Sequence, residues 1–396
     1  MTSTDSLIII GAGLAGWTTA REFRKLDSTT PVLLITADGG HFYAKPSLSN
    51  AFAQKRAPDQ LVSTPAAKMV ETQNVTLLAH TRVEAIHSTT RSITTTRGEF
   101  RYSQLVLATG AQPIRVPVAG DAADQVQSVN SLDDFTRFHA HLTSTHLAGE
   151  PQRQKHVLIM GAGLIGCEFA NDLAASGYAV TVVDPSGGPI AALLPVEAST
   201  QLREALAGLG VAWHFGATVK SVDTVATGSP AAGHLQVALS NGQAALVDAV
   251  LSAIGLRADT ALAQAAGLTC ERGVVVDTTL QTSAPHIYVL GDSAQYASAG
   301  GRTLPYVMPI MNAAKALAAT LAGTRTEVVF PLMPVAIKTP ALPIVVAAPA
   351  PGTPGGWHGV EPGIWQFMDA QGQQRGFVLT GPQTSRRAEQ AKRVAA

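Results

Sequence analysis

The chain has 396 residues, of which 46% are hydrophobic and 14% are charged, and its 28 lysines and arginines balance 28 aspartates and glutamates. This composition excludes disordered, collagen-like and coiled-coil proteins, and the length allows more than one hydrophobic core. A formal net charge of zero excludes a global field that would attract nucleic acid or an anionic membrane.

The two cysteines, Cys167 and Cys270, stand far apart in the sequence. Their spacing excludes a CxxC redox pair and a four-thiolate metal site, and so few cysteines suit a reducing compartment. The first residues show no secretory signal pattern, and the apolar stretch at residues 341–350 is interrupted by prolines. We therefore expect a cytoplasmic protein with no membrane insertion.

A ten-residue pattern occurs twice, as LIIIGAGLAG at residues 7–16 and as VLIMGAGLIG at residues 157–166. In both copies a continuously apolar strand precedes the glycines, a helical pattern follows and a second strand completes a βαβ unit. We expect the helices at residues 18–26 and 167–175 and the second strands at residues 31–36 and 179–184.

Other elements lie between and after these units. Asn130 opens a helix in which Ser131 and Asp134 fit a capping box. We expect strands at residues 105–111, 212–215, 235–239, 249–254 and 287–290, helices at residues 196–209 and 309–321, and a hairpin loop at residues 228–230. Beyond Gly323 frequent prolines indicate the strands and turns of a small separate domain.

The glycine spacing GxGxxG has a mechanical meaning between a strand and a helix. The first glycine turns the chain, the second admits a pyrophosphate and the third lets helix and strand pack closely. The helix amides and dipole then hold the phosphate charge without a basic side chain. The glycines concerned are Gly11, Gly13 and Gly16 in the first unit and Gly161, Gly163 and Gly166 in the second.

A carboxylate near the end of the second strand commonly binds the adenosine ribose. Asp184 follows Gly161 by 23 residues and predicts NADH rather than NADPH, whereas Asp38 stands two or three residues late in the first unit. Two dinucleotide sites imply a relay between a bound FAD and a nicotinamide substrate. The predicted fold is α/β, with two Rossmann-like dinucleotide-binding domains and a small α+β C-terminal domain. The predicted boundaries are 1–118 with 246–325 for the FAD-binding domain, 119–245 for the NAD-binding domain and 326–396 for the C-terminal domain.

The segments LATGA at residues 107–111 and TSAPHIYVLGDSA at residues 282–294, together with the two glycine turns, resemble the FAD-dependent pyridine nucleotide-disulfide oxidoreductases. The resemblance implies that Asp292 binds the ribityl chain of FAD and that the helix near Pro309 points its N-terminus at the flavin. The expected FAD-binding residues are Gly11, Gly13, Leu14, Ala15, Gly16, Asp38, Lys45, Pro46, Ala108, Thr109, Gly110, Gly291, Asp292 and Val307. The expected NAD-binding residues are Gly161, Gly163, Leu164, Ile165, Gly166, Glu168, Asp184 and Gly255.

Without a thiol pair beside the flavin, electrons must pass directly to an external acceptor. The segment KPSLS at residues 45–49 resembles the RPPLSK motif of reductases that feed ferredoxins, but Asn50 replaces its final lysine. In those relatives this lysine pairs with a glutamate that matches Glu168. Glu168 therefore pairs with Lys45 or with Lys338, or it contacts the nicotinamide, and these three residues are the expected catalytic set. No general base and no metal ligand are expected.

Four segments, KPxLS, GAxPIRVPVxGD, GAGLIGCEFANDL and YVMP, resemble the rubredoxin reductase branch of this family. The resemblance implies electron transfer from NADH through tightly bound, non-covalent FAD to rubredoxin. Two alternatives stay open: a ferredoxin reductase of a Rieske or P450 oxygenase system, and a binding flavoprotein that senses NADH. A monomer and a dimer are both compatible with the sequence.

Two charged regions carry further expectations. The C-terminal region holds five basic residues against one acidic residue, Glu389: Arg375, Arg386, Arg387, Lys392 and Arg393. A solvated, disordered tail is the favoured interpretation, and a docking surface for an acidic rubredoxin is the other. The histidines at positions 139, 141 and 146 are expected on a solvated helix face, not around a metal.

Overall fold

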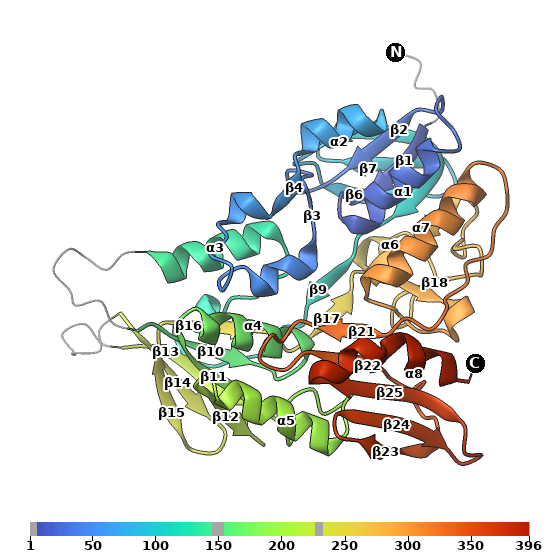
Figure 1. Ribbon diagram of the computed structural model, residues 1–396. Coiled ribbons are helices and arrows are strands. Elements are labelled where there is room, and N and C mark those ends of the chain that lie inside the picture. The colour runs from blue at the N-terminus through green and yellow to red at the C-terminus, as the bar shows by residue number, and fades with distance from the viewer. Residues whose placement is uncertain (1–5, 145–153, 226–232, 396) are drawn as a thin grey trace. The chain divides into compact units, whose positions relative to one another are not determined.

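The computed structural model describes residues 6–144, 154–225 and 233–395 (Figure 1). Residue contacts divide the chain into two compact units. The first contains the described residues within 1–44, 62–112 and 256–333, and the second contains those within 45–61, 113–255 and 334–396.

The first unit is built on a mostly parallel sheet in the order β5-β2-β1-β8-β7-β6, to which β19 adds beside β8. The strands are β1 (Ser6–Ile10), β2 (Val32–Ile35), β5 (Thr76–Leu78), β6 (Val83–His87), β7 (Ser92–Thr95), β8 (Gly98–Leu107) and β19 (Ile287–Val289). β1 is almost fully buried, as its continuous apolar sequence predicts for a central parallel strand.

Helices and short strands complete this unit. α1 (Leu14–Arg24) packs against α7 (Val307–Leu321), and the fully buried Trp17 and Phe23 of α1 belong to the main hydrophobic core. The other elements are α2 (Ala66–Gln73), α6 (Ala261–Ala265), β3 (Phe42–Tyr43), β4 (Val62–Thr64), β17 (Leu256–Ala258), β18 (Val274–Val276), β20 (Ala294–Tyr296) and the 3₁₀ turns η4 (Gly291–Ser293) and η5 (Ala297–Ala299). The strand β9 (Ala111–Pro113) begins in this unit, and its last residue belongs to the second.

The second unit contains a four-stranded parallel sheet in the order β12-β11-β10-β16. These strands are β10 (His156–Met160), β11 (Ala179–Asp184), β12 (Val211–Phe215) and β16 (Ala249–Ser252). The helices are α3 (Leu132–Thr143), α4 (Leu164–Ala175) and α5 (Val196–Ala207), and an antiparallel sheet adds β13 (Val219–Thr224), β14 (Leu235–Leu239) and β15 (Ala244–Val247). The 3₁₀ turns η1 (Lys45–Asn50), η2 (Pro58–Leu61) and η3 (Ala123–Gln125) also belong to this unit.

The C-terminal part of the second unit is a five-stranded sheet in the order β21-β22-β25-β24-β23 with the helix α8. Its elements are β21 (Val335–Ile337), β22 (Ile344–Ala347), β23 (Gly355–Glu361), β24 (Ile364–Asp369), β25 (Gln374–Thr380), η6 (Gly381–Arg386) and α8 (Arg387–Arg393). Ile364, Phe377 and Leu379 form a small core of their own, against which Val394 packs. In Figure 1 this sheet lies beside α5, where Thr380 Oγ1 donates to Gln201 Oε1 at 2.8 Å.

Several bounds differ from those predicted. α1 and α4 begin four and three residues earlier than expected, because Gly13 and Gly163 are themselves the N-cap residues. Asp134 N donates to Ser131 Oγ at 3.1 Å, which confirms the predicted cap of α3. The predicted hairpin loop at 228–230 lies outside the described residues.

The border between the two dinucleotide-binding parts also differs from the predicted one. β16 was expected in the FAD-binding domain, yet it pairs in parallel with β10, and Val250 and Leu251 are buried in that sheet. Residues 45–61 likewise belong to the second unit. Both differences depend on which distant strands and segments pack together, and the local apolar pattern does not encode this. Within the described ranges, no helix is long and apolar enough to cross a membrane.

Candidate functional site

The first glycine turn joins β1 to α1 in the first unit. Gly11 has a φ of +108°, and a Cβ there would lie 2.3 Å from the carbonyl oxygen of Ala108. A Cβ on Gly16 would lie 1.8 Å from the carbonyl oxygen of Gly11. Glycine is therefore required at the first position for backbone rotation and at both positions for close packing.

Gly13 differs from these two glycines, because the packing of the protein itself does not require a glycine there. It is the N-cap of α1, no described side chain caps the helix there, and a Cβ on Gly13 would meet no atom within 4 Å. The first-turn amides thus lack a side-chain partner, and the space in front of Gly13 is open. This arrangement fits the pyrophosphate of a dinucleotide.

The second turn repeats this geometry between β10 and α4. Gly161 has a φ of +103°, and its Cβ would lie 2.6 Å from the Ala253 carbonyl oxygen. A Cβ on Gly166 would lie 2.0 Å from the Gly161 carbonyl oxygen, whereas one on Gly163 would meet no atom within 4 Å. Leu164 and Ile165 open α4, and the side chain of Ile165 is exposed. The second turn therefore fits a second dinucleotide pyrophosphate.

The two predicted ribose-binding carboxylates differ in their contacts. Asp184 ends β11, and its carboxylate accepts hydrogen bonds from Ala162 N at 2.6 Å and from Ser186 N at 2.7 Å. Because Ala162 is part of the glycine turn, Asp184 lies beside that turn. Asp38 accepts instead from Thr36 Oγ1 at 2.7 Å and Gly40 N at 2.9 Å in its own loop.

The turn after β19 holds Gly291 and the half-buried Asp292. Gly291 has a φ of +83°, and a Cβ there would lie 3.1 Å from the Cβ of Ala15, so this turn meets the first glycine turn. The fully buried Tyr296 hydroxyl accepts from Gly291 N at 2.8 Å and donates to Gly291 O at 3.2 Å. Burial raises the pKa of Tyr296, which stays neutral and keeps both bonds.

Other predicted flavin and nicotinamide contacts occupy turns. Thr109 Oγ1 donates to Asp259 O at 3.1 Å, and the neighbouring Gly110 has a φ of +73°. Val307, half exposed, is the first residue of α7, two residues before the predicted start. Gly255 has a φ of +115°, and its carbonyl oxygen accepts from Ile114 N at 3.0 Å.

A partly buried ion pair lies in the second unit, between α4 and the segment after β21. Lys338 Nζ lies 2.6 Å from Glu168 Oε2, and Lys338 N donates to Glu168 Oε1 at 3.0 Å. Ser49 Oγ donates to the same Oε2 atom at 2.6 Å, and Lys338 Nζ also donates to Ser49 Oγ at 2.9 Å and to Pro46 O. Lys45, Lys338 and the nicotinamide were the partners left open for Glu168, and the structure shows the contact with Lys338. Lys45 and Pro46 lie in the same unit, and their contact with a flavin stays a prediction.

Both cysteines are free thiols whose pKa is raised by burial. Cys167 is fully buried in α4, its Sγ donates to Ala162 O at 3.3 Å, and burial raises its pKa. Cys270 is half-buried, burial also raises its pKa, and both thiols are free. The interpretation of Cys167 as a buried structural residue is confirmed.

His139 and His141 lie on α3, and His146 is outside the described residues. The His139 ring stacks on Phe52 with 5.4 Å between ring centroids, and His141 Nε2 lies 2.8 Å from Asp248 O. Within residues 6–144, 154–225 and 233–395, no cluster of ligands could hold a metal ion.

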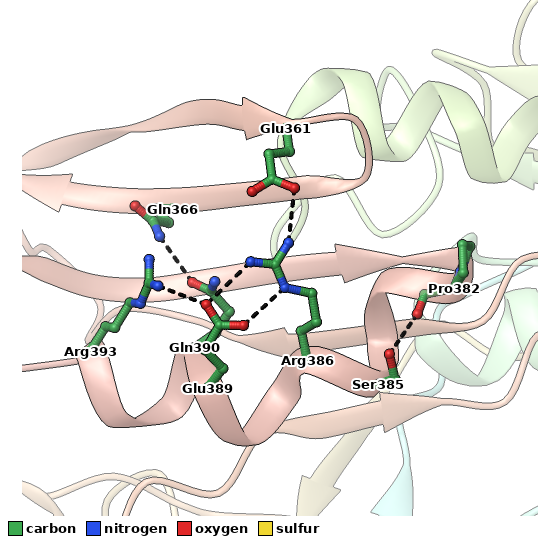
Figure 2. A network of polar contacts seen from close by, with 8 residues as sticks. All are labelled: Glu361, Gln366, Pro382, Ser385, Arg386, Glu389, Gln390 and Arg393. Carbon is green, nitrogen blue, oxygen red and sulfur yellow. Dashed lines mark hydrogen bonds and ion pairs between the residues drawn. The ribbon is translucent and has the colours of Figure 1, made fainter.

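The basic C-terminal region is folded, so its interpretation as a solvated, disordered tail is wrong (Figure 2). Arg386 bonds to Glu361 and to Glu389, each at 2.9 Å, and Arg393 bonds to Glu389 at 2.7 Å. These contacts tie α8 to the β23 end, and Arg386 holds the pKa of Glu389 below its ordinary value. Arg375 pairs with Asp369 at 2.7 Å, whereas Arg387 and Lys392 are exposed.

Sequence reasoning missed three polar residues that support these sites: Asn171 and Asp172 on α4, and Tyr296. The available signal was a polar stripe on an otherwise apolar helix, since Glu168, Asn171 and Asp172 lie three and four residues apart among fully buried neighbours. The sequence did not indicate a role for Tyr296, because a tyrosine in a short apolar strand usually belongs to the hydrophobic core.

Two family models match the chain. One described as "Pyridine nucleotide-disulphide oxidoreductase" matches residues 5–319, and one described as "Rubredoxin binding C-terminal domain" matches residues 327–394. Together with the mostly parallel first sheet, the parallel sheet of the second unit and the C-terminal sheet, these matches confirm the predicted fold class.

Curated relatives are similar along nearly the whole chain. The chain is 43% identical to a rubredoxin-NAD(+) reductase of Alcanivorax borkumensis, with 95% of this chain and 94% of that protein covered. It is 41% identical to the protein of the same name from Acinetobacter baylyi, with the same coverage. A nitric oxide reductase FlRd-NAD(+) reductase of Aeromonas salmonicida is 38% identical over 96% of this chain and 94% of that protein.

Solved structures share the fold. A ferredoxin reductase for the CYP199A2 system from Rhodopseudomonas palustris superposes with a TM-score of 0.82 at 26% identity, covering 95% of this chain and 91% of that chain. The reductase in a covalent putidaredoxin reductase-putidaredoxin complex superposes with a TM-score of 0.85 at 22% identity, covering 99% of this chain and 94% of that chain. At that identity the second likeness shows the fold alone.

Proposed function

Because this chain belongs to the pyridine nucleotide-disulphide oxidoreductase family, we propose that it passes electrons from NADH through FAD to rubredoxin. The observation that carries the proposal is the match of residues 327–394 to a rubredoxin-binding domain in a chain that also has two dinucleotide turns. The protein is an oxidoreductase that uses FAD and NADH, and we place it in the cytoplasm, where NADH is available.

The residues of the first unit suit a permanently bound FAD. The amides of α1 and the open space at Gly13 would hold the pyrophosphate, and Asp292 would accept hydrogen bonds from the ribityl hydroxyls. Tyr296 fixes the turn that presents Asp292. The chemistry that FAD would supply at this site is the conversion of a two-electron hydride donor into a source of single electrons.

The residues of the second unit suit NADH as an exchangeable substrate. The turn at Gly163 would hold the pyrophosphate, and the Asp184 carboxylate would bind the adenosine ribose hydroxyls. A 2′-phosphate about 4 Å from this carboxylate would be repelled by about 4 kcal/mol per charge at an effective dielectric of 20. This repulsion favours NADH over NADPH.

We assign Glu168, Lys338 and Lys45 to the catalytic machinery. Glu168 is only 5% exposed, its charge is balanced by Lys338, and its carboxylate also accepts a hydrogen bond from the Ser49 hydroxyl. A partly buried pair that is also hydrogen-bonded to Ser49 holds both side chains in one geometry. Hydride transfer between two rings needs such fixed surroundings and no general base.

The acceptor is tested by steady-state turnover of the purified holoprotein with NADH. A bacterial rubredoxin and a [2Fe–2S] ferredoxin are each titrated, and cytochrome c reports the electrons they deliver. We expect rubredoxin to support turnover at least about tenfold faster than ferredoxin, as complementary docking requires. Faster turnover with ferredoxin would assign the chain to an oxygenase system instead.

The sensor alternative is separated by a stopped-flow measurement. The flavin is first reduced with one equivalent of NADH and then mixed with excess rubredoxin. An electron carrier is reoxidised within seconds. A reduced flavin that persists for minutes beside the acceptor would identify a protein that signals the NADH level.

A further inference from the structure

Helix α4 carries three polar side chains on one buried face. Glu168, Asn171 and Asp172 are 5%, 2% and 2% exposed, and their spacing of three and four residues places them side by side. Each accepts hydrogen bonds from a segment far away in the sequence. The helix that begins at the second dinucleotide turn thus holds two remote segments in place.

The first of these segments follows the η1 turn. Asp172 Oδ2 accepts from Phe52 N at 2.9 Å, and Asp172 Oδ1 accepts from Ala53 N at 2.9 Å. The buried Phe52 ring packs edge-on against Phe135 and Tyr178, with centroid distances of 5.5 and 5.7 Å. One residue is therefore held both by its amide and by its ring.

The second segment follows β21. Asn171 Oδ1 accepts from Ala341 N at 3.0 Å, and Glu168 Oε1 accepts from Lys338 N at 3.0 Å. Ser49 and Lys338, one from each segment, both bond to Glu168 Oε2. The meeting of these two side chains depends on how α4 positions both segments.

A buried carboxylate is a costly way to bind two amides, because burial disfavours its charged form. The pKa of Asp172 is accordingly raised by burial, although the two amides partly offset this. Each carboxylate oxygen takes one amide, so the group fixes both the position and the orientation of residues 52 and 53. An apolar residue could fill the same volume without this fixation.

We propose that Asp172 is a positioning residue: it fixes residues 45–53 on α4 so that Ser49 meets the Glu168–Lys338 pair. Its effect on flavin reduction rests on the proposed function, whereas its effect on the segment does not. Asp172 itself acts through the backbone of Phe52 and Ala53.

The test variant is Asp172→Asn. An asparagine keeps the shape of the aspartate side chain but places an NH2 group, which is a donor, against the backbone N–H of either Phe52 or Ala53. One of the two hydrogen bonds is therefore lost. Asp133→Asn, in the exposed first turn of α3, is the matched control. If Asp172→Asn does not fold, Asp172→Ser replaces it, since a single hydroxyl offers one acceptor atom for the two amides.

The first readout is amide hydrogen exchange of residues 45–53, followed by mass spectrometry on flavin-free and flavin-loaded protein. We expect exchange at Phe52 and Ala53 to accelerate by about tenfold or more in Asp172→Asn and to be unchanged in Asp133→Asn. Unchanged protection of both amides would overturn the proposal, whatever the protein's activity.

The second readout is the rate constant of flavin reduction at saturating NADH. We expect a decrease of about 10- to 100-fold with the NADH dissociation constant within about twofold of the wild type, because small misplacements mainly affect the reacting geometry. Ser49→Ala combined with Asp172→Asn should be less than additive. A wild-type rate in Asp172→Asn contradicts the inference, whereas a reduced flavin that fails to pass electrons to rubredoxin contradicts only the proposed function.

Discussion

Lys338 Nζ lies 2.6 Å from Glu168 Oε2 although 170 residues separate the two in sequence. The lysine comes from the C-terminal segment and the glutamate from the helix that begins at the second glycine turn. The C-terminal segment therefore contributes the positive charge that pairs with Glu168 on α4.

Lys338→Met leaves the buried Glu168 carboxylate without its counter-ion. We expect the free energy of unfolding to fall by about 3 kcal/mol, because removal of the partly exposed lysine leaves an uncompensated charge on the buried carboxylate. Urea denaturation measures this loss. The double variant Lys338→Met/Glu168→Gln should recover part of it, and Lys392→Met on the exposed face of α8 should change stability by no more than about 0.5 kcal/mol. A Lys338→Met protein as stable as Lys392→Met would show that the pair is not formed.

Gly13→Ala should impair FAD binding, whereas Gly16→Ala should impair folding. A Cβ on Gly13 meets no protein atom within 4 Å, so this variant should fold with a loss of no more than about 1 kcal/mol but retain far less FAD. A Cβ on Gly16 lies 1.8 Å from a carbonyl oxygen, so that variant should not accumulate in folded form. Flavin content by absorbance and stability by thermal melting separate the two. Full flavin retention in Gly13→Ala would place the pyrophosphate elsewhere.

Asp184→Ala should raise the KM for NADH by about tenfold through loss of the ribose hydrogen bonds, with a smaller change in kcat. Removing the charge should also narrow the preference for NADH over NADPH. Because Asp184 also accepts from Ala162 N, the comparison includes Asp184→Asn, which removes the charge while keeping an acceptor oxygen. An unchanged KM together with no gain for NADPH would remove Asp184 from the cofactor site.

His156 predicts a pH dependence of stability near neutrality. Its pKa is lowered, chiefly by burial, and its ring contacts Leu246 O at 3.1 Å and Thr181 Oγ1 at 2.9 Å. The unfolded chain, with a histidine pKa of about 6.5, binds the proton more readily than the folded state does. Stability should therefore be complete above that pH and decrease as the pH falls from it toward the lower folded pKa.

Urea midpoints at several pH values between 8 and 5 test this dependence. His156→Gln should flatten the profile, and His358→Gln, at an exposed position of β23, should leave it unchanged. A wild-type profile that is flat between pH 7 and 5.5, or one that His156→Gln does not alter, would contradict the assignment.

Local features of the chain were readable from the sequence, and long-range partners were not. Residues 179–184 form a strand with the predicted bounds, and both glycine turns have the predicted geometry, because a strand pattern and a turn depend on neighbouring residues. The contact of Lys338 with Glu168 depends on where residues 334–341 pack, which no periodicity encodes.

The basic C-terminal region is a second case in which the long-range partners of a residue could not be predicted from the sequence. Basic residues near a chain end usually remain solvated. Here Arg386 at the end of η6 and Arg393 on α8 both bond to Glu389 on α8, and Arg386 also bonds to Glu361 on β23 (Figure 2). The spacing of four residues between Glu389 and Arg393 is typical of an ion pair on one helix face, so this contact can be predicted from the sequence. The contact of Arg386 with Glu361 cannot, because it depends on the order of strands in the sheet.

The route of the electrons should not involve a protein thiol. Burial raises the pKa of Cys167 and of Cys270, so at pH 8 each thiol has less of the reactive thiolate than an ordinary cysteine. We expect iodoacetamide to leave Cys167 unmodified in the native holoprotein, to label the half-buried Cys270 slowly and to leave the rate of flavin reduction by NADH unchanged. Peptide mass spectrometry identifies the labelled sites, and the variant Cys167→Ser/Cys270→Ser provides the control, with turnover within about twofold of the wild type. Activity that falls in parallel with alkylation, or that disappears in the double variant while the flavin remains bound, would place a sulfur between the flavin and its acceptor.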